Sequence, residues 1–162
     1  MKQGALGLIY DLTHTQVLLI QRRDVPVWVL PGGGIDENET PEEAICREVR
    51  EETGLEVRVV RKVAEYVPIN ALVKPAHLFE CRVISGLLLT TTSETRACAY
   101  FCLDNLPQDL FFIHKDFIQD ATANLPPQQK SLTQVTYWNL AKYFIRHPWQ
   151  VLRFARSYFT AS

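Results

Sequence analysis

The sequence is poor in cysteine and lacks the closely spaced cysteine pairs that hold structural zinc. Its four cysteines are Cys46, Cys81, Cys98 and Cys102, and no two of them form a CxxC pair. Structural zinc sites usually draw their ligands from such pairs, so this spacing argues against a zinc centre. We expect four reduced, mostly buried thiols in a cytoplasmic protein.

Long hydrophobic runs and a strong net charge are also missing. No apolar run approaches the ~20 residues that a membrane-spanning helix needs, and residues 1–16 lack the apolar core of a signal peptide. The formal net charge of -1 argues against a protein that coats nucleic acid along its surface. Because 47% of the residues are hydrophobic, we expect residues 1–162 to form one domain with a substantial core.

Acidic residues are absent from the last quarter of the chain. No Asp or Glu follows Asp120, whereas Lys and Arg continue and aromatic residues are dense. We expect C-terminal helices over about residues 131–160, with aromatic side chains packed on the domain. Two alternatives are a homodimer interface and contact of residues 149–162 with a membrane surface, of which the membrane contact is the less favoured.

What the chain does contain is a mixture of strand and helix signals. β-Branched and apolar runs between turn residues predict strands at residues 5–10, 17–21, 27–30, 55–67, 78–84 and 97–103. Helices are predicted at residues 41–53, 115–123 and 132–147, with a hairpin loop at 11–16 and a further loop at 124–130. This order is typical of an α/β or α+β domain rather than of a regular βαβ ladder.

The helix at residues 41–53 has clear end signals. Thr40 is a candidate N-cap, Pro41 occupies the first helical position, and Glu43 completes a capping box. Gly54 is a candidate for the left-handed residue that ends the helix. We therefore predict the bounds of this helix from its own residues.

Three glutamates in this helix stand on one side. Glu48, Glu51 and Glu52 are spaced i, i+3, i+4, so they share an arc of roughly 100° that borders the apolar face. Arg47 and Arg50 are predicted to point elsewhere. Crowded carboxylates with little solvent repel one another, and a hard divalent cation such as Mg²⁺ or Mn²⁺ would remove that cost.

A glycine-rich stretch precedes the acidic helix. Pro31 is followed by Gly32, Gly33 and Gly34, which are predicted to form a flexible loop at the end of a strand. Glycine lets the backbone approach a ligand or an ion closely. The loop and the helix together indicate one binding site.

Residues 33–55, GGIDENETPEEAICREVREETGL, resemble a complete Nudix box. The specified positions of that pattern are filled by Gly33, Glu39, Arg47, Glu48, Val49, Glu51, Glu52, Gly54 and Leu55. The resemblance implies an α/β/α sandwich with a mixed central sheet, a catalytic loop and helix, and C-terminal helices. It also implies hydrolysis of a nucleoside diphosphate linked to another group.

The resemblance assigns roles residue by residue. Glu48, Glu51 and Glu52 would bind Mg²⁺ or Mn²⁺, with the Gly32 carbonyl as an additional ligand. A further acid outside the box often acts as ligand or base in this family. Glu94 is the better candidate and Glu80 the second. Glu39 and Arg47 resemble a structural ion pair that joins the loop to the helix.

The substrate stays open at this point. The residues predicted to contact it are Arg22, Arg23, Gly33 and Gly34, whereas Trp28 is predicted to pack in the structure. The resemblance favours a nucleotide-type small molecule: a nucleoside triphosphate, an ADP-ribose-like compound or a dinucleoside polyphosphate. The alternatives are a non-catalytic nucleotide sensor and an RNA 5′-end pyrophosphohydrolase, and no stable nucleic acid partner is expected.

Overall fold

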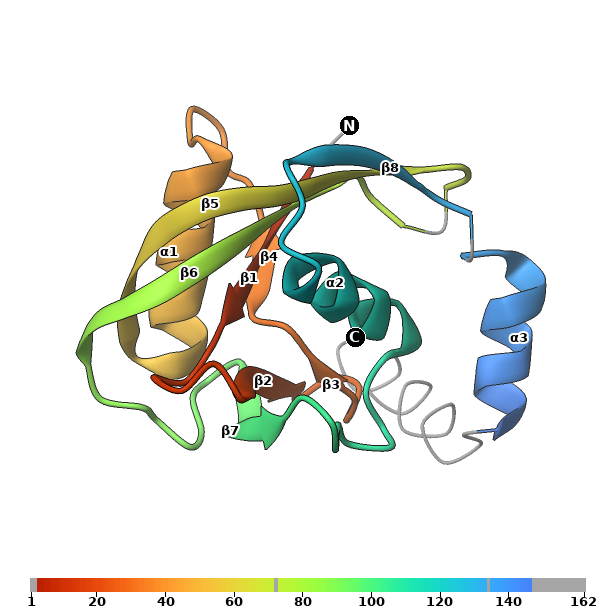
Figure 1. Ribbon diagram of the computed structural model, residues 1–162. Coiled ribbons are helices and arrows are strands. Elements are labelled where there is room, and N and C mark those ends of the chain that lie inside the picture. Colours follow the sequence, from red (N-terminus) through yellow and green to blue (C-terminus); the bar gives the residue numbers. More distant parts are fainter. Residues whose placement is uncertain (1–2, 72, 134, 147–162) are drawn as a thin grey trace.

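The computed structural model describes residues 3–71, 73–133 and 135–146, and Figure 1 shows how their strands and helices are layered. The strands are β1 (Gly4–Ile9), β2 (Gln16–Arg22), β3 (Trp28–Val29), β4 (Gly32–Gly34), β5 (Leu55–Pro68), β6 (Ala76–Gly86), β7 (Thr95–Cys102) and β8 (Gln128–Leu132). The helices are α1 (Pro41–Thr53), α2 (Phe112–Thr122) and α3 (Tyr137–Arg146). All six predicted strands are present, with ends that differ by no more than two residues.

Two sheets separate the first two helices. The larger sheet has the order β4-β1-β6-β5-β8, with both parallel and antiparallel pairs, and the smaller has the order β3-β2-β7. Helix α1 lies on one side of the larger sheet and α2 on the other (Figure 1). The α/β/α arrangement with a mixed central sheet is therefore confirmed.

Each helix covers its own hydrophobic cluster. Ile45 and Val49 of α1 belong to one cluster, and Phe117 of α2 belongs to the other. Strand β2 contributes to both, because Leu18 faces the α1 cluster while Leu19 faces the α2 cluster. A strand buried on both faces has no polar alternation, which explains its continuous apolar sequence.

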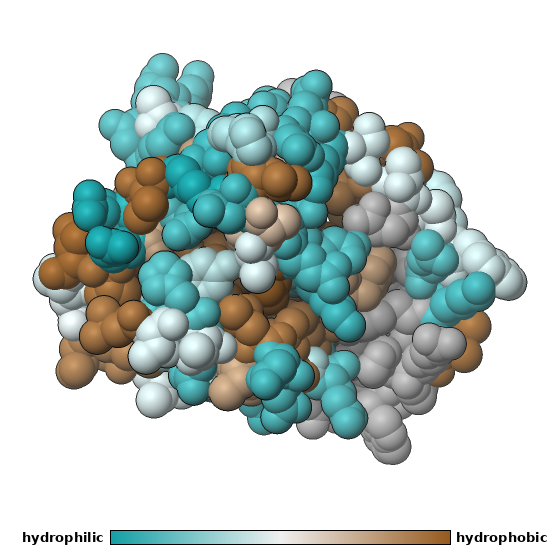
Figure 2. Space-filling view, in the orientation of Figure 1, coloured by the Kyte–Doolittle hydropathy of each residue, from teal (hydrophilic) through white to brown (hydrophobic). Residues whose placement is uncertain are grey.

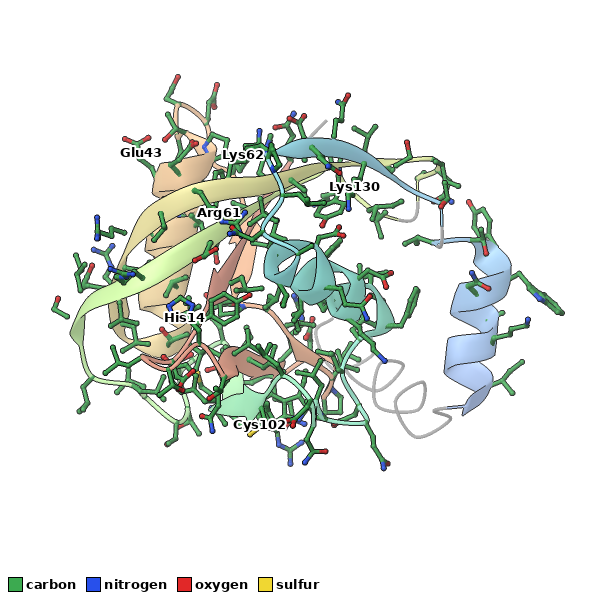
Figure 3. The ribbon with its side chains drawn as sticks, in the orientation of Figure 1. His14, Glu43, Arg61, Lys62, Cys102 and Lys130 are labelled. Atoms are coloured by element: carbon green, nitrogen blue, oxygen red, sulfur yellow. The ribbon has the colours of Figure 1, made fainter. Side chains whose placement is uncertain are left out.

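The ends of α1 follow the signals in its sequence. The Thr40 hydroxyl accepts a hydrogen bond from the Glu43 amide at 3.2 Å, and the Glu43 carboxylate accepts one from the Thr40 amide at 2.9 Å. Figure 3 shows Glu43 at the start of the helix. Gly54 ends it with φ = 74°, a left-handed conformation that favours glycine. The predicted capping box and C-cap are confirmed.

One prediction about the N-terminal half is wrong. Residues 32–34 are not a loop but strand β4, which pairs antiparallel with β1. The predicted turn at residues 11–16 is present: an antiparallel bridge joins Tyr10 to Val17, and the Asp11 amide donates to the Gln16 carbonyl at 3.1 Å, although β1 and β2 belong to different sheets. Strand β4 arises from pairing with a distant segment, which local residue preferences do not reveal.

The C-terminal third also differs from the prediction. Residues 128–132, expected to lie in a loop or at the start of a helix, form β8 parallel to β5 at the edge of the larger sheet. Main-chain pairing holds this polar strand, and Lys130 forms an ion pair with Asp120 at 2.6 Å. Helix α2 begins at Phe112 and α3 at Tyr137. The part of the predicted C-terminal helices that follows residue 146 lies outside the described residues.

The structure also shows the state of the cysteines and the character of the helices. All four cysteines are free, with Cys81 and Cys98 buried, Cys46 half-buried and Cys102 exposed. Within the described residues, no helix has both the length and the apolar character that crossing a membrane requires.

One buried histidine connects α2 to the strand that leads into β4. His114 is 7% exposed, and its Nδ1 accepts a hydrogen bond from the Leu30 amide at 3.1 Å. This bond requires an unprotonated Nδ1. Burial, with a smaller contribution from the positive charge of Arg22, lowers the pKa of His114 from 6.5 to about 3.

We expect His114 to make the fold sensitive to acid. Below pH 6.5 the unfolded chain gains a proton at this residue, and the folded chain does not until about pH 3. The stability that His114 confers is therefore complete above pH 6.5 and is lost as the pH falls towards 3, by up to about 1.4 kcal/mol per pH unit. Denaturant unfolding of the wild type and of His114→Asn, which keeps an acceptor but does not titrate, measures the difference. Equal slopes between pH 6.5 and 4 would contradict this expectation.

Candidate active site

Three glutamates from two segments meet beside the glycine strand. One carboxylate oxygen of each of Glu48, Glu52 and Glu94 lies within 4.8 Å of the others. Glu48 and Glu52 are buried on α1, whereas Glu94 is exposed in the loop that leads into β7. Oxygens on opposite sides of an octahedral Mg²⁺ are about 4.2 Å apart. The three acids therefore need only small movements to share one ion.

The other candidate acids lie elsewhere. Glu51 is exposed, and its carboxylate is 3.3 Å from the guanidinium of Arg47, outside the three-acid group. Glu80 faces the opposite side of the sheet, where it pairs with Arg61 at 2.8 Å. Figure 3 shows Arg61 on the side of the sheet that α2 covers, and the same guanidinium donates to the Ala121 carbonyl. Of the two candidates outside the box, the structure brings Glu94 to the site.

Arg47 does not point away from the acids as predicted, but lies among them. Its Nε and Nη2 donate to the two carboxylate oxygens of Glu39, both at 2.8 Å. Its Nη1 donates to Glu48 at 2.8 Å, and Nη2 also reaches the Gly34 carbonyl at 3.0 Å. A long side chain can curl back along its own helix, so the direction of the Cα–Cβ bond did not reveal this position.

The carboxylates of the site are electrostatically strained. The pKa of Glu52 is raised to about 8, chiefly by burial and also by the negative charges of Glu48 and Glu94, although the Gly32 amide and the charge of Arg22 oppose the shift. Burial also raises the pKa of Glu48, although Arg47 opposes the shift. An added positive charge at this point would stabilise both ionised carboxylates.

The glycines of β4 make room for these carboxylates. The Gly32 amide donates to Glu52 at 2.8 Å. A Cβ at Gly33 would lie 2.3–2.5 Å from the carboxylate atoms of Glu48, so only glycine leaves that space. A Cβ at Gly34 would meet no described atom within 4 Å. The strand is thus shaped around Glu48 at one position only.

The two arginines at the end of β2, Arg22 and Arg23, have different surroundings. Arg22 holds Asp24 through two hydrogen bonds of 2.8 and 2.6 Å, is half-exposed, and contributes positive charge at Glu52. Arg23 instead donates from Nε and Nη2 to the Thr92 carbonyl, at 3.0 and 2.8 Å. Their contact with substrate stays a prediction, and Arg23 already braces the loop that carries Glu94.

Sequence reasoning missed two threonines that support this loop. Thr95 is fully buried, and its hydroxyl donates to the main-chain carbonyl of Glu52 at 3.1 Å. The Thr92 hydroxyl is 3.0 Å from that of Thr95. Within the run Thr90-Thr91-Thr92 no local pattern distinguishes the supporting residue, because its partners are distant in sequence.

A large groove lies away from the acids. It has a volume of about 620 Å³ and lies between the turn after β1 and the ends of β5 and β6, lined among others by Tyr10, Leu12, Val60, Ile84 and Tyr100. Hydrophobic residues gather on this lower left part of the face shown in Figure 2.

Trp28 packs edge-on against Phe101, with ring centroids 4.7 Å apart, as its predicted structural role requires.

A pair of glycine variants tests the shape of the site. Gly33→Ala should push the Glu48 carboxylate aside and weaken Mn²⁺ binding roughly tenfold or more, because a displaced ligand costs affinity on the scale of 10–100-fold. Gly34→Ala, in the same strand, should bind as the wild type does. Titration calorimetry with Mn²⁺ measures both, with thermal unfolding as the check on folding. Equal affinities of the two variants would contradict the assignment of Glu48 to this space.

This chain is similar in sequence to known proteins. A family model of the NUDIX domain matches residues 1–121. A MutT-like protein of Streptomyces ambofaciens is 32% identical over 116 residues, which cover 72% of this chain and 74% of that protein. An ADP-ribose pyrophosphatase of Methanocaldococcus jannaschii is 34% identical over 113 residues, covering 65% and 64%.

The fold has solved counterparts as well. The crystal structure of an ADP-ribose pyrophosphatase from Streptococcus suis superposes with a TM-score of 0.66 and 26% identity, covering 80% of this chain and 98% of that one. The family match spans the glycine strand, α1 and Glu94, which together build the acidic site. The chain therefore belongs to the Nudix hydrolase family.

Proposed function

We propose that this Nudix hydrolase is a metal-dependent pyrophosphohydrolase that cleaves the diphosphate linkage of a nucleoside diphosphate joined to another group. The observation that carries the proposal is the meeting of Glu48, Glu52 and Glu94 at one point. Two of these acids are buried, and the pKa of each is raised by burial and by the neighbouring acids. A cluster of buried acids of this kind attracts a cation and repels an anion.

The residues present fit a divalent ion. Glu48, Glu52 and Glu94 would hold Mg²⁺ or Mn²⁺ through carboxylate oxygens, the ligand type that these hard ions prefer. Glu51 and the Gly32 carbonyl are the further ligands that we propose. When bound, the ion supplies charge neutralisation at the diphosphate and a lowered pKa for water.

The rest of the site positions the substrate and the acids. Arg22 is half-exposed beside Glu52, so its guanidinium is available to a phosphate oxygen. A Cβ at Gly34 would meet no described atom within 4 Å, so a diphosphate can approach the main chain there, whereas the Glu48 carboxylate fills the space at Gly33. The ion pair between Glu39 and Arg47 holds the preceding loop to α1 during turnover.

The names of the relatives fit this substrate class. The Methanocaldococcus and Streptococcus proteins are both named as ADP-ribose pyrophosphatases, and ADP-ribose is a nucleoside diphosphate joined to a sugar. ADP-ribose-like compounds, nucleoside triphosphates and dinucleoside polyphosphates are therefore the substrates to compare. A sensor that only binds nucleotide is disfavoured because the acids meet in a geometry that suits an ion. The free thiols fit a reducing, cytoplasmic setting.

Removing one buried carboxylate tests the proposal. Glu52→Gln keeps the shape of the side chain and a partner for the Gly32 amide, but loses the negative charge at the site. We expect turnover to fall roughly 10³-fold while the thermal midpoint stays unchanged or rises, because a strained charge is removed. Release of phosphate or nucleoside monophosphate from each of the three substrate types, with Mg²⁺ or Mn²⁺, measures turnover.

A second acid provides the matched control. Glu80→Gln is an equally conservative substitution on the opposite face of the sheet, next to Arg61. This variant should keep most of the wild-type turnover. Substantial activity in Glu52→Gln, or activity in the wild type without any divalent ion, would overturn the proposed function.

A further inference from the structure

The loop between β6 and β7 has to place Glu94 beside two acids of another element. Glu94 is exposed, and its neighbours in the loop are short polar residues, in the sequence Thr90-Thr91-Thr92-Ser93-Glu94. An exposed side chain on such a segment samples many positions unless its main chain is fixed. The hydrogen bonds that fix this main chain therefore decide where the carboxylate lies.

Thr92 accepts the main-chain hydrogen bonds at this point. Its hydroxyl oxygen accepts from the amide of Glu94 at 3.2 Å and from the amide of Thr95 at 3.1 Å. A hydroxyl has two acceptor positions and one proton to donate. Both acceptor positions are thus occupied by amides at and next to Glu94, and the proton remains for a further partner.

That proton continues the chain of hydrogen bonds to α1. Thr95 donates its own proton to the main-chain carbonyl of Glu52, so its hydroxyl can only accept from Thr92, at 3.0 Å. The sequence of donors is fixed: Thr92 to Thr95, and Thr95 to Glu52. One end of this chain holds the main chain of Glu94 and the other holds that of Glu52, two of the three acids that meet.

Arg23 braces the same loop from β2. Its guanidinium donates twice to the Thr92 carbonyl, and its amide donates to the Glu94 carbonyl at 3.4 Å. Thr92 is therefore held through its carbonyl by Arg23 while its hydroxyl holds Glu94. These hydrogen bonds connect the loop both to the end of β2 and to α1.

From these contacts we propose that Thr92 is a positioning residue for Glu94, which it holds beside Glu48 and Glu52 through the hydroxyl chain that ends on Glu52. The inference rests on the proposed metal site and deepens it. Thr92 does not touch the ion or the substrate. It sets the affinity for the divalent ion by fixing the main chain of one ligand.

Mn²⁺ calorimetry on four variants tests this role. Thr92→Val keeps the shape and removes the hydroxyl, and should weaken Mn²⁺ binding about tenfold. Thr92→Ser restores a hydroxyl and should bind within about twofold of the wild type. Thr91→Val is the matched control, because Thr91 is exposed and its hydroxyl has no hydrogen bond within the described part of the chain. Thr92→Ala provides a second hydroxyl-free variant should the valine variant not fold.

Combination with Glu94→Gln separates positioning from a general effect on the fold. If Thr92 acts through Glu94, then Thr92→Val should change Mn²⁺ affinity by less than about twofold once Glu94 is already Gln. The same tenfold loss in both backgrounds, or no loss in the wild-type background, overturns the inference. Equal Mn²⁺ affinity of the wild type and Glu94→Gln instead overturns the proposed three-acid site itself, so the two failures are distinguishable.

Discussion

The candidate site is organised around two acidic side chains that are buried next to one another. Glu48 and Glu52 lie one helical turn apart on α1, and both face the glycine strand rather than solvent. Carboxylates in such a position lose hydration and repel, which raises the pKa of each. The surroundings offset this cost with the Gly32 amide at Glu52 and the Arg47 guanidinium at Glu48. The missing Cβ of Gly33 leaves the space that the Glu48 carboxylate fills.

This compensation is incomplete, which agrees with the proposed binding of a divalent cation. Arg47 divides one positive charge among Glu39, Glu48 and Glu51. The nearby charge of Arg22 is already paired with its neighbour in the loop. Carboxyl groups therefore outnumber the guanidinium groups near them. Under the proposed function, a divalent cation would supply the remaining charge.

The sequence predicted what depends on local or periodic signals. The bounds of α1 followed from Thr40 and Gly54, and the clustering of Glu48 and Glu52 followed from the period of the helix. It did not predict β4 or β8, because glycines and polar residues become strands only through main-chain partners far along the chain. The direction of Arg47 was also inaccessible, since a flexible side chain follows its partners rather than its position on the helix.

The contacts that stabilise the fold differ from those that arrange the acids of the site. The two hydrophobic clusters hold α1 and α2 against the sheet and involve neither the Gly33 main chain nor the Thr92 hydroxyl. The acids, in contrast, come from a helix and from a loop whose placement depends on a few hydrogen bonds of ordinary strength. Each such bond contributes about 1 kcal/mol to stability, which a domain of this size tolerates losing. Because the proposed ion site requires three oxygens at once, we expect the same loss at the loop to weaken ion binding while the fold persists.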